Sequence, residues 1–323
     1  VLGSPTSSSI VASVLAAAGS SVYVEYDTIP AVPGRYAKKS LAVTPPASQL
    51  TNPVATVSLT GLAANTRYYY RVNVKAKGAA AYVPGDQHSF YTARNSGSTF
   101  SFGVQGDSHP ERVSTMFNAD LYKLTMLEVA KRQPDLYFTL GDDFSLEANA
   151  TAFKNAYCTQ FGYTKCGVYG PSGHDKTYGG YGFREKLEGK LNQNAWGLYN
   201  SLNTKFVQGV MGENVDGVLD ARFSGYGTYL EQRQKYLSLL SHSTSLFLVN
   251  GNHELTHYAN IGGLFNNLAI WGAEAHNKFY ANPAPNGFYT GDTETFLTGD
   301  PKLNGFPGLT GDGLLRDYYA FTW

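Results

Sequence analysis

Residues 136–143 read Leu-Tyr-Phe-Thr-Leu-Gly-Asp-Asp, an apolar run that ends in a glycine and two carboxylates. The chain repeats this arrangement twice. Phe100–Val104 precedes Gly106-Asp107-Ser108-His109, and Leu246–Val249 precedes Asn250-Gly251-Asn252-His253-Glu254. Short apolar runs bounded by turn residues predict buried strands. We therefore expect three buried strands, each of which ends in a short polar loop.

Amphipathic helices are predicted between these strands. Residues 117–132 carry apolar side chains at helical spacing, and Pro134 marks the end of that helix. We expect its core-facing side chains to be Phe117, Leu121, Leu124 and Leu127. A second helix over 229–240 begins at a capping box, Thr228-x-x-Glu231. Strands that alternate with helices predict an α/β fold.

Four of the loop residues suit a metal ion. The carboxyl ends of neighbouring parallel strands meet at one edge of a sheet, where ligands collect. The expected ligands are Asp107, His109, Asp142 and Asn252. Carboxylate, imidazole and amide oxygen favour Mn, Fe, Zn or Ca over a metal that prefers thiolate. A single Gly-Asp pair is usually only a turn, so the prediction rests on the three clusters together.

Residues 1–94 have a different pattern, which predicts an all-β sandwich. Short alternating runs are separated by Pro, Gly, Ser and Asn. They lie at 10–14, 22–26, 54–59, 68–74 and 89–92. Tyr68 follows a turn at the start of one run, which is the position of a tyrosine that hydrogen-bonds back across its loop. Alternation places Tyr68 and Tyr70 on one face of that strand and Tyr69 on the other.

The bulk composition excludes some partners. The chain has 323 residues, with 25 Lys plus Arg against 25 Asp plus Glu, so its formal net charge is zero. Proteins that hold nucleic acid mainly through phosphate contacts carry a basic excess. We therefore expect no stable nucleic-acid partner. We also expect no membrane span, because no apolar run is long enough.

Two further segments bear on where the protein works. Cys158 and Cys166 could form a disulfide that closes a small loop or could be unrelated thiols; we prefer the disulfide, which implies an oxidising compartment. We therefore expect a secreted protein, extracellular or periplasmic. A linker at 95–98 precedes the α/β region, and residues 144–227 read as a long insertion rich in Gly and Tyr, whose role the sequence does not assign.

The motifs resemble those of the calcineurin-like metallophosphoesterases. That superfamily carries D-x-H, then G-D, then G-N-H-[DE], and the three strings stand here in that order. With the N-terminal sandwich, the chain is most similar to the PhoD-like and purple acid phosphatase-like branch. The resemblance implies a fibronectin type III-like module at 1–94 and an α/β/β/α catalytic domain at 99–323. Ser145 stands where purple enzymes have an iron-binding tyrosine, so we expect no tyrosinate-ligated iron.

The resemblance also implies roles for single residues. Asp107 and His109 would bind one metal ion, Asp142 would bridge two ions, and Asn252 would bind the second. His253 would act near the leaving oxygen as a general acid or as a stabiliser of charge. Glu254 would orient that imidazole, with helix capping or packing as an equal alternative. The implied reaction is attack of a metal-bound hydroxide on a small phosphate ester.

The chain departs from the superfamily pattern after His276, where no further histidine follows. The usual His and G-H-x-H motifs are absent. Asp317–Trp323 reads as the opening of another strand, so we expect the sequence to lack a C-terminal part and to be inactive as it stands. The alternatives are a nucleotidase or phosphodiesterase of the same superfamily, and a secreted binding protein that keeps the fold without catalysis. The sequence predicts no oligomeric state.

Overall fold

The protein is represented by a computed structural model. The structure describes residues 1–45, 53–109, 116–143, 229–251, 254, 276–293, 314, 316 and 318–323. The predicted insertion, both cysteines, Asn252 and His253 lie outside these described residues.

The expected strands are present, with bounds within two residues of those predicted. The early strands are β1 (Leu2–Gly3), β2 (Ser9–Leu15), β3 (Ser21–Asp27), β4 (Lys38–Lys39), β5 (Val54–Thr60), β6 (Arg67–Lys75), β7 (Val83–Pro84) and β8 (His88–Tyr91). The later strands are β9 (Phe102–Gln105), β10 (Leu136–Thr139), β11 (Ser245–Leu248), β12 (Thr290–Gly291) and β13 (Tyr319–Ala320). The helical elements are α1 (Ala119–Arg132), α6 (Tyr229–Gln232), the π-helical turn η2 (Arg233–Leu237) and α7 (Ser238–Ser241).

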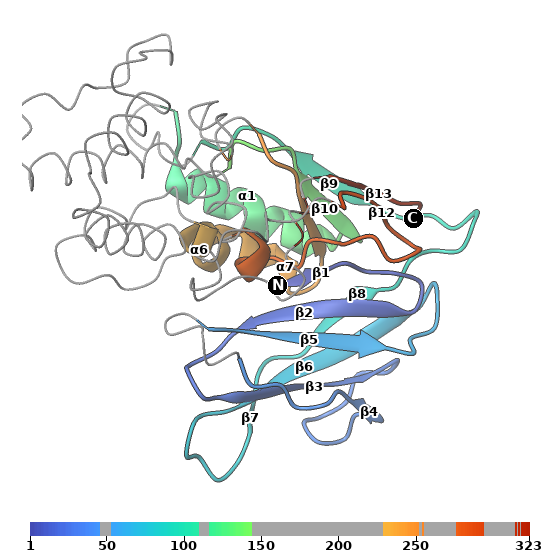
Figure 1. The fold of residues 1–323 in the computed structure, drawn as a ribbon, viewed down its shortest axis with the longest axis vertical. Coiled ribbons are helices and arrows are strands. Elements are labelled where there is room, and N and C mark those ends of the chain that lie inside the picture. The colour runs from blue at the N-terminus through green and yellow to red at the C-terminus, as the bar shows by residue number, and fades with distance from the viewer. Residues whose placement is uncertain are drawn as a thin grey trace, which may run out of the picture.

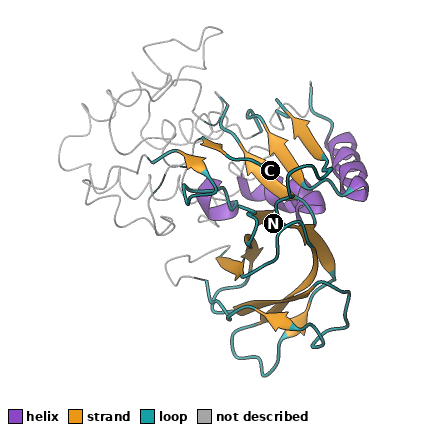
Figure 2. Cartoon of the chain, turned by 90° about the vertical axis from the view of Figure 1, so that its right-hand side faces the viewer, coloured by secondary structure: helices purple, strands orange, loops and turns teal. Residues whose placement is uncertain are grey.

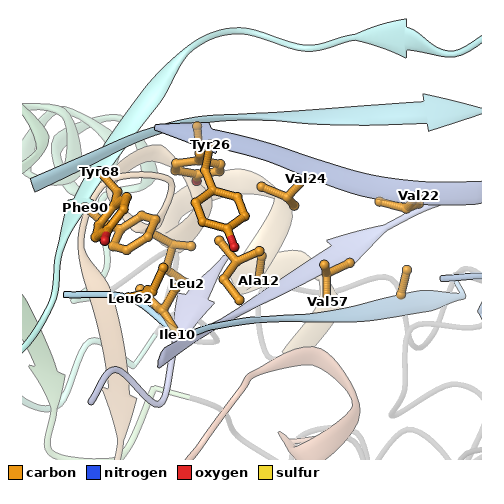
Figure 3. Packing of buried hydrophobic residues seen from close by; sticks show 13 residues of the cluster. Leu2, Ile10, Ala12, Val22, Val24, Tyr26, Val57, Leu62, Tyr68 and Phe90 are labelled. Carbon is orange, nitrogen blue, oxygen red and sulfur yellow. The ribbon is translucent and has the colours of Figure 1, made fainter. Parts of the chain in front are cut away.

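The N-terminal part is β-rich, as predicted. Strands β5, β2 and β1 lie side by side in one sheet, and β4, β3, β6 and β7 form a second, in which β8 also pairs with β6. Side chains from both sheets pack into one apolar core between them (Figure 3). Its members include Leu2, Ile10, Val22, Val24, Val57, Tyr68 and Phe90. Burial of this shared core holds the two sheets together.

Tyr68 makes the hydrogen bond that its position predicted. Its side chain is buried in the core beside that of Tyr70, while Tyr69 is only half-buried on the other face of β6. The Ala63 backbone N–H donates to the Tyr68 hydroxyl at 2.9 Å. The hydroxyl therefore closes the turn that leads into β6.

Replacing Tyr68 by Phe is expected to lower the free energy of unfolding by about 1–2 kcal/mol, because the Ala63 N–H loses its acceptor in a partly buried turn. Urea unfolding measures the change. Tyr69→Phe is the matched control on the same strand and should unfold within about 0.5 kcal/mol of the unaltered chain. Equal losses in the two variants would contradict the role of the Tyr68 hydroxyl.

The second part is α/β. Strands β11, β10 and β9 are parallel, with Leu136 opposite both Ser245 and Phe102. Helices α1 and α7 lie together on one side of these strands (Figures 1 and 2). The other face carries a largely aromatic cluster to which the C-terminal residues contribute. Parallel strands with helices on a face are what the strand–helix–strand pattern predicted.

The two parts share a sheet, which the sequence did not predict. Strand β1 pairs with β2 on one edge and, in parallel, with β11 on the other, so Leu2 lies opposite Ser245. The resulting order is β5-β2-β1-β11-β10-β9. The Tyr70 hydroxyl also donates to the His242 carbonyl oxygen at 2.6 Å. The β-rich part is therefore joined to the α/β part through backbone pairing, while its predicted boundary near residue 94 stays a prediction.

Of the predicted core-facing side chains of the first helix, Phe117, which precedes α1, is buried, but the predicted buried face of the helix itself is wrong. Leu121 and Leu124 are 62% and 57% exposed, whereas Met126 is fully buried. Helix α1 packs against η2 and α7 through the side that carries Tyr122 and Met126, so its orientation is rotated relative to the predicted one. The helix begins after Asn118, whose side chain accepts the Leu121 N–H.

Two other predictions need correction. Strand β9 is not buried: among the strands that the structure describes it lies at the edge of its sheet, next to β10 alone, and Phe102 is 57% exposed. The helix predicted at 229–240 begins at Tyr229 but contains the π-helical turn at 233–237. Thr228 is outside the described residues, so the capping box is untested.

Among the described residues, no helix is both long and apolar enough to cross a membrane.

Candidate metal centre

Three potential metal ligands converge where β9 and β10 end. Asp107 and His109 follow β9, and Asp142 follows β10. His109 Nε2 lies 3.7 Å from Asp107 Oδ1 and 3.7 Å from Asp142 Oδ2. One ligand atom from each of the three residues lies within 4.8 Å of the others. His109 and Asp142 are buried, while the Asp107 side chain is 75% exposed, which leaves the group open to solvent on one side.

These positions fit a cation. Ligand atoms at about 2.0–2.6 Å from one ion lie roughly 3–4 Å apart, close to the separations observed here. Two carboxylates and one imidazole are the ligand types expected for Mn, Fe, Zn or Ca. The group therefore has a spacing and a set of ligand types that could hold a metal ion, and the roles of Asp107, His109 and Asp142 as ligands stay a prediction.

Backbone bonds join the two loops that carry these ligands. The Asp107 N–H donates to the Gly141 carbonyl oxygen at 3.1 Å, and the His109 N–H donates to that of Asp142 at 3.0 Å. All three candidate ligands have left-handed backbones, with φ of 49° at Asp107, 43° at His109 and 56° at Asp142. Such residues cost about 1 kcal/mol or more each and are found at functional sites. The strain here is concentrated on the residues that offer ligand atoms.

The loop after β10 also packs directly against the loop after β11. A Cβ atom added to Gly141 would lie 2.2 Å from the Gly251 nitrogen, and one added to Gly251 would lie 2.2 Å from Asp142 Oδ1. Gly141 has a φ of 96°, which side chains rarely allow. The two glycines of the Gly-Asp and Gly-Asn strings therefore let these backbones touch beside the candidate ligands.

Glu254 contacts both of these loops. Its side chain accepts the backbone N–H groups of Asp142 at 2.9 Å, Asp143 at 2.8 Å and Gly251 at 2.7 Å. The residue is 3% exposed. Burial raises the pKa of its carboxyl to about 7, while the hydrogen bond from the Asp142 N–H opposes that rise. The predicted contact with the His253 imidazole stays a prediction, because His253 lies outside the described residues, as does Asn252.

A polar network behind the candidate ligands joins Asp143 to Gln105, Tyr122 and Tyr137, three residues that the sequence reasoning missed. Gln105, the last residue of β9, donates from Nε2 to Asp143 Oδ1 at 2.8 Å and to the Tyr122 hydroxyl at 2.7 Å. Its Oε1 accepts the Tyr137 hydroxyl at 2.8 Å. Burial raises the pKa of the Asp143 carboxyl to about 6, against hydrogen bonds such as that from Gln105. The available signal was a polar residue, Gln105, directly after the predicted strand at 100–104.

The proteins to which this chain is similar are found among solved structures. No protein-family model and no curated protein matches the chain. Among solved structures it is similar to PhoD, with a TM-score of 0.44 and 15% identity over 88% of this chain and 46% of that one. It is also similar to the sensor domain of the anti-sigma factor RsgI4 of Pseudobacteroides cellulosolvens, with a TM-score of 0.22 and 17% identity over 31% of this chain and 90% of that domain. The chain thus spans less than half of the PhoD structure.

Proposed function

We propose that this chain carries the metal site of a phosphoric ester hydrolase. The observation that supports the proposal most is the approach of Asp107, His109 and Asp142 at the ends of two parallel strands. The order of the Asp-x-His, Gly-Asp and Gly-Asn-His-Glu strings also supports it. The site is open to solvent at Asp107, while the His109 imidazole and the Asp142 carboxylate are buried. Such a site suits a small charged substrate that enters from one side.

The proposal assigns each residue a task. Asp107, His109 and Asp142 would hold one cation, and Asp142 together with the amide oxygen of Asn252 would hold a second. Cations in such a site polarise a phosphoryl oxygen and lower the pKa of bound water. His253 donates a proton to the leaving oxygen. The substrate is a small phosphate monoester or diester, and the protein acts outside the cytoplasm.

Two measurements test the proposal, first of metal binding and then of hydrolysis. The full-length protein, stripped of metal with a chelator, is titrated with Mn, Zn, Fe or Ca and assayed with p-nitrophenyl phosphate and bis-p-nitrophenyl phosphate. We expect saturable binding, and hydrolysis that chelation removes and metal restores. The preferred ester distinguishes a monoesterase from a diesterase. A chain that binds none of these ions would overturn the metal site, and binding without turnover of either ester would overturn the hydrolase.

A further inference from the structure

Glu254 differs from the proposed ligands because its carboxylate is directed at the backbone. Both of its oxygens accept main-chain N–H groups: Oε2 accepts those of Asp142 and Gly251, and Oε1 accepts that of Asp143. The distances, 2.7–2.9 Å, are those of hydrogen bonds to a charged acceptor. Glu254 therefore connects the loop after β10 with the loop after β11.

These hydrogen bonds act on the backbone around Asp142, one of the three candidate ligands. Gly141 and Asp142 both have positive φ, so the following N–H groups turn inward toward one point. Consecutive N–H groups in such a turn form a concave site for an anion. The Glu254 carboxylate lies in that concavity and satisfies N–H groups of a backbone that carries strain at Asp142.

The same turn sets where the Asp142 side chain points. Its Oδ2 lies 3.7 Å from His109 Nε2, and its carbonyl oxygen accepts the His109 N–H. On its other side, the loop that carries Asp142 packs against Gly251. A Cβ atom at position 251 would collide with the Asp142 side chain. A shift of the Asp142 backbone would therefore move one candidate ligand away from the others.

We propose that Glu254 is a positioning residue, whose carboxylate binds the Asp142, Asp143 and Gly251 N–H groups and thereby holds Asp142 in the geometry that binds metal. This role rests on the proposed metal site. Glu254 reaches the ion only through Asp142, in the way that hydrogen-bonded partners of metal ligands set ligand orientation. This role does not depend on the predicted contact in which Glu254 orients the His253 imidazole.

The test compares Glu254→Gln with the unaltered chain. A glutamine amide has one oxygen and one NH2 group, so one end of the side chain presents a donor to a backbone donor. We expect the affinity for Mn or Zn, measured by competition with a metal indicator, to fall about 10–100-fold. We also expect the Asp142, Asp143 and Gly251 amides of the metal-free protein to exchange faster with deuterium. Glu254→Asp, one methylene shorter, should give an intermediate loss.

A control separates positioning from general destabilisation. Met126→Ala empties a fully buried position of α1 away from the loops, so it should lower the unfolding temperature but leave metal affinity within threefold of the original. Unchanged affinity or unchanged amide exchange in Glu254→Gln would overturn the positioning role while leaving the hydrolase proposal intact. If the unaltered chain bound no metal, the proposed function and the effect of Glu254 on metal affinity would both be overturned.

Discussion

In the full-length protein, Asp142→Asn is expected to lower metal-dependent phosphate ester hydrolysis about a thousandfold and to weaken metal binding in parallel. Asp142 lies 3.7 Å from His109 and belongs to the only group of three candidate ligands found among the described residues. The substitution removes one negative charge from the ligand set. A thousandfold loss corresponds to about 4 kcal/mol of stabilisation, the size of effect that a correctly held metal ion supplies.

The variant separates chemistry from folding. Asn has nearly the shape of Asp, and its backbone can still donate its N–H to Glu254 and accept the His109 N–H at its carbonyl oxygen. We therefore expect the metal-free variant to unfold at the same temperature as the unaltered chain or slightly higher, because a buried carboxylate has been removed. Asp120→Asn, in the exposed first turn of α1, is the matched control and should keep full activity. Unaltered metal affinity in Asp142→Asn would show that Asp142 is not a ligand.

The sequence predicted that these three side chains lie together because its signals are local. An apolar run followed by a polar loop identifies the end of a strand, and parallel strands bring such ends to one edge. Asp107, His109 and Asp142 meet there because β9 and β10 pair in register, with Gln105 opposite Thr139. The same reasoning could not show that Glu254 binds backbone N–H groups, since every residue except proline offers that donor.

Other features depend on contacts between distant residues. Strand β1 has only two residues, and its partner Ser245 lies far along the chain from Leu2, so no local pattern indicates their pairing. Helix α1 has apolar side chains on both of its faces: Leu121 and Leu124 on one, Tyr122 and Met126 on the other. Hydrophobic spacing alone does not select between those faces. The face of α1 that is buried is the one that packs on η2 and α7.

The largest effect on stability is expected at Arg233, which connects three segments of the fold. It is the first residue of η2 and is 3% exposed. Its guanidinium donates to Ser13 Oγ at 2.8 Å, to the Ser13 carbonyl oxygen at 2.6 Å and to the Phe279 carbonyl oxygen. Burial lowers the pKa of Arg233 to about 10, so the group stays charged at neutral pH. One side chain thus binds β2 of the β-rich part to two segments of the α/β part.

Arg233→Ala is expected to lower the free energy of unfolding by about 3–5 kcal/mol, measured by urea denaturation. The substitution leaves buried carbonyl oxygens of Ser13 and Phe279 without this donor and opens a cavity. Arg233→Met separates these causes, because it keeps most of the volume and removes the buried charge with its desolvation cost. We expect Met to lose less than half as much as Ala. If Ala cost under about 1 kcal/mol, Arg233 would not be what holds β2 against η2, and the pairing of β1 with β11 would have to join the two parts without it.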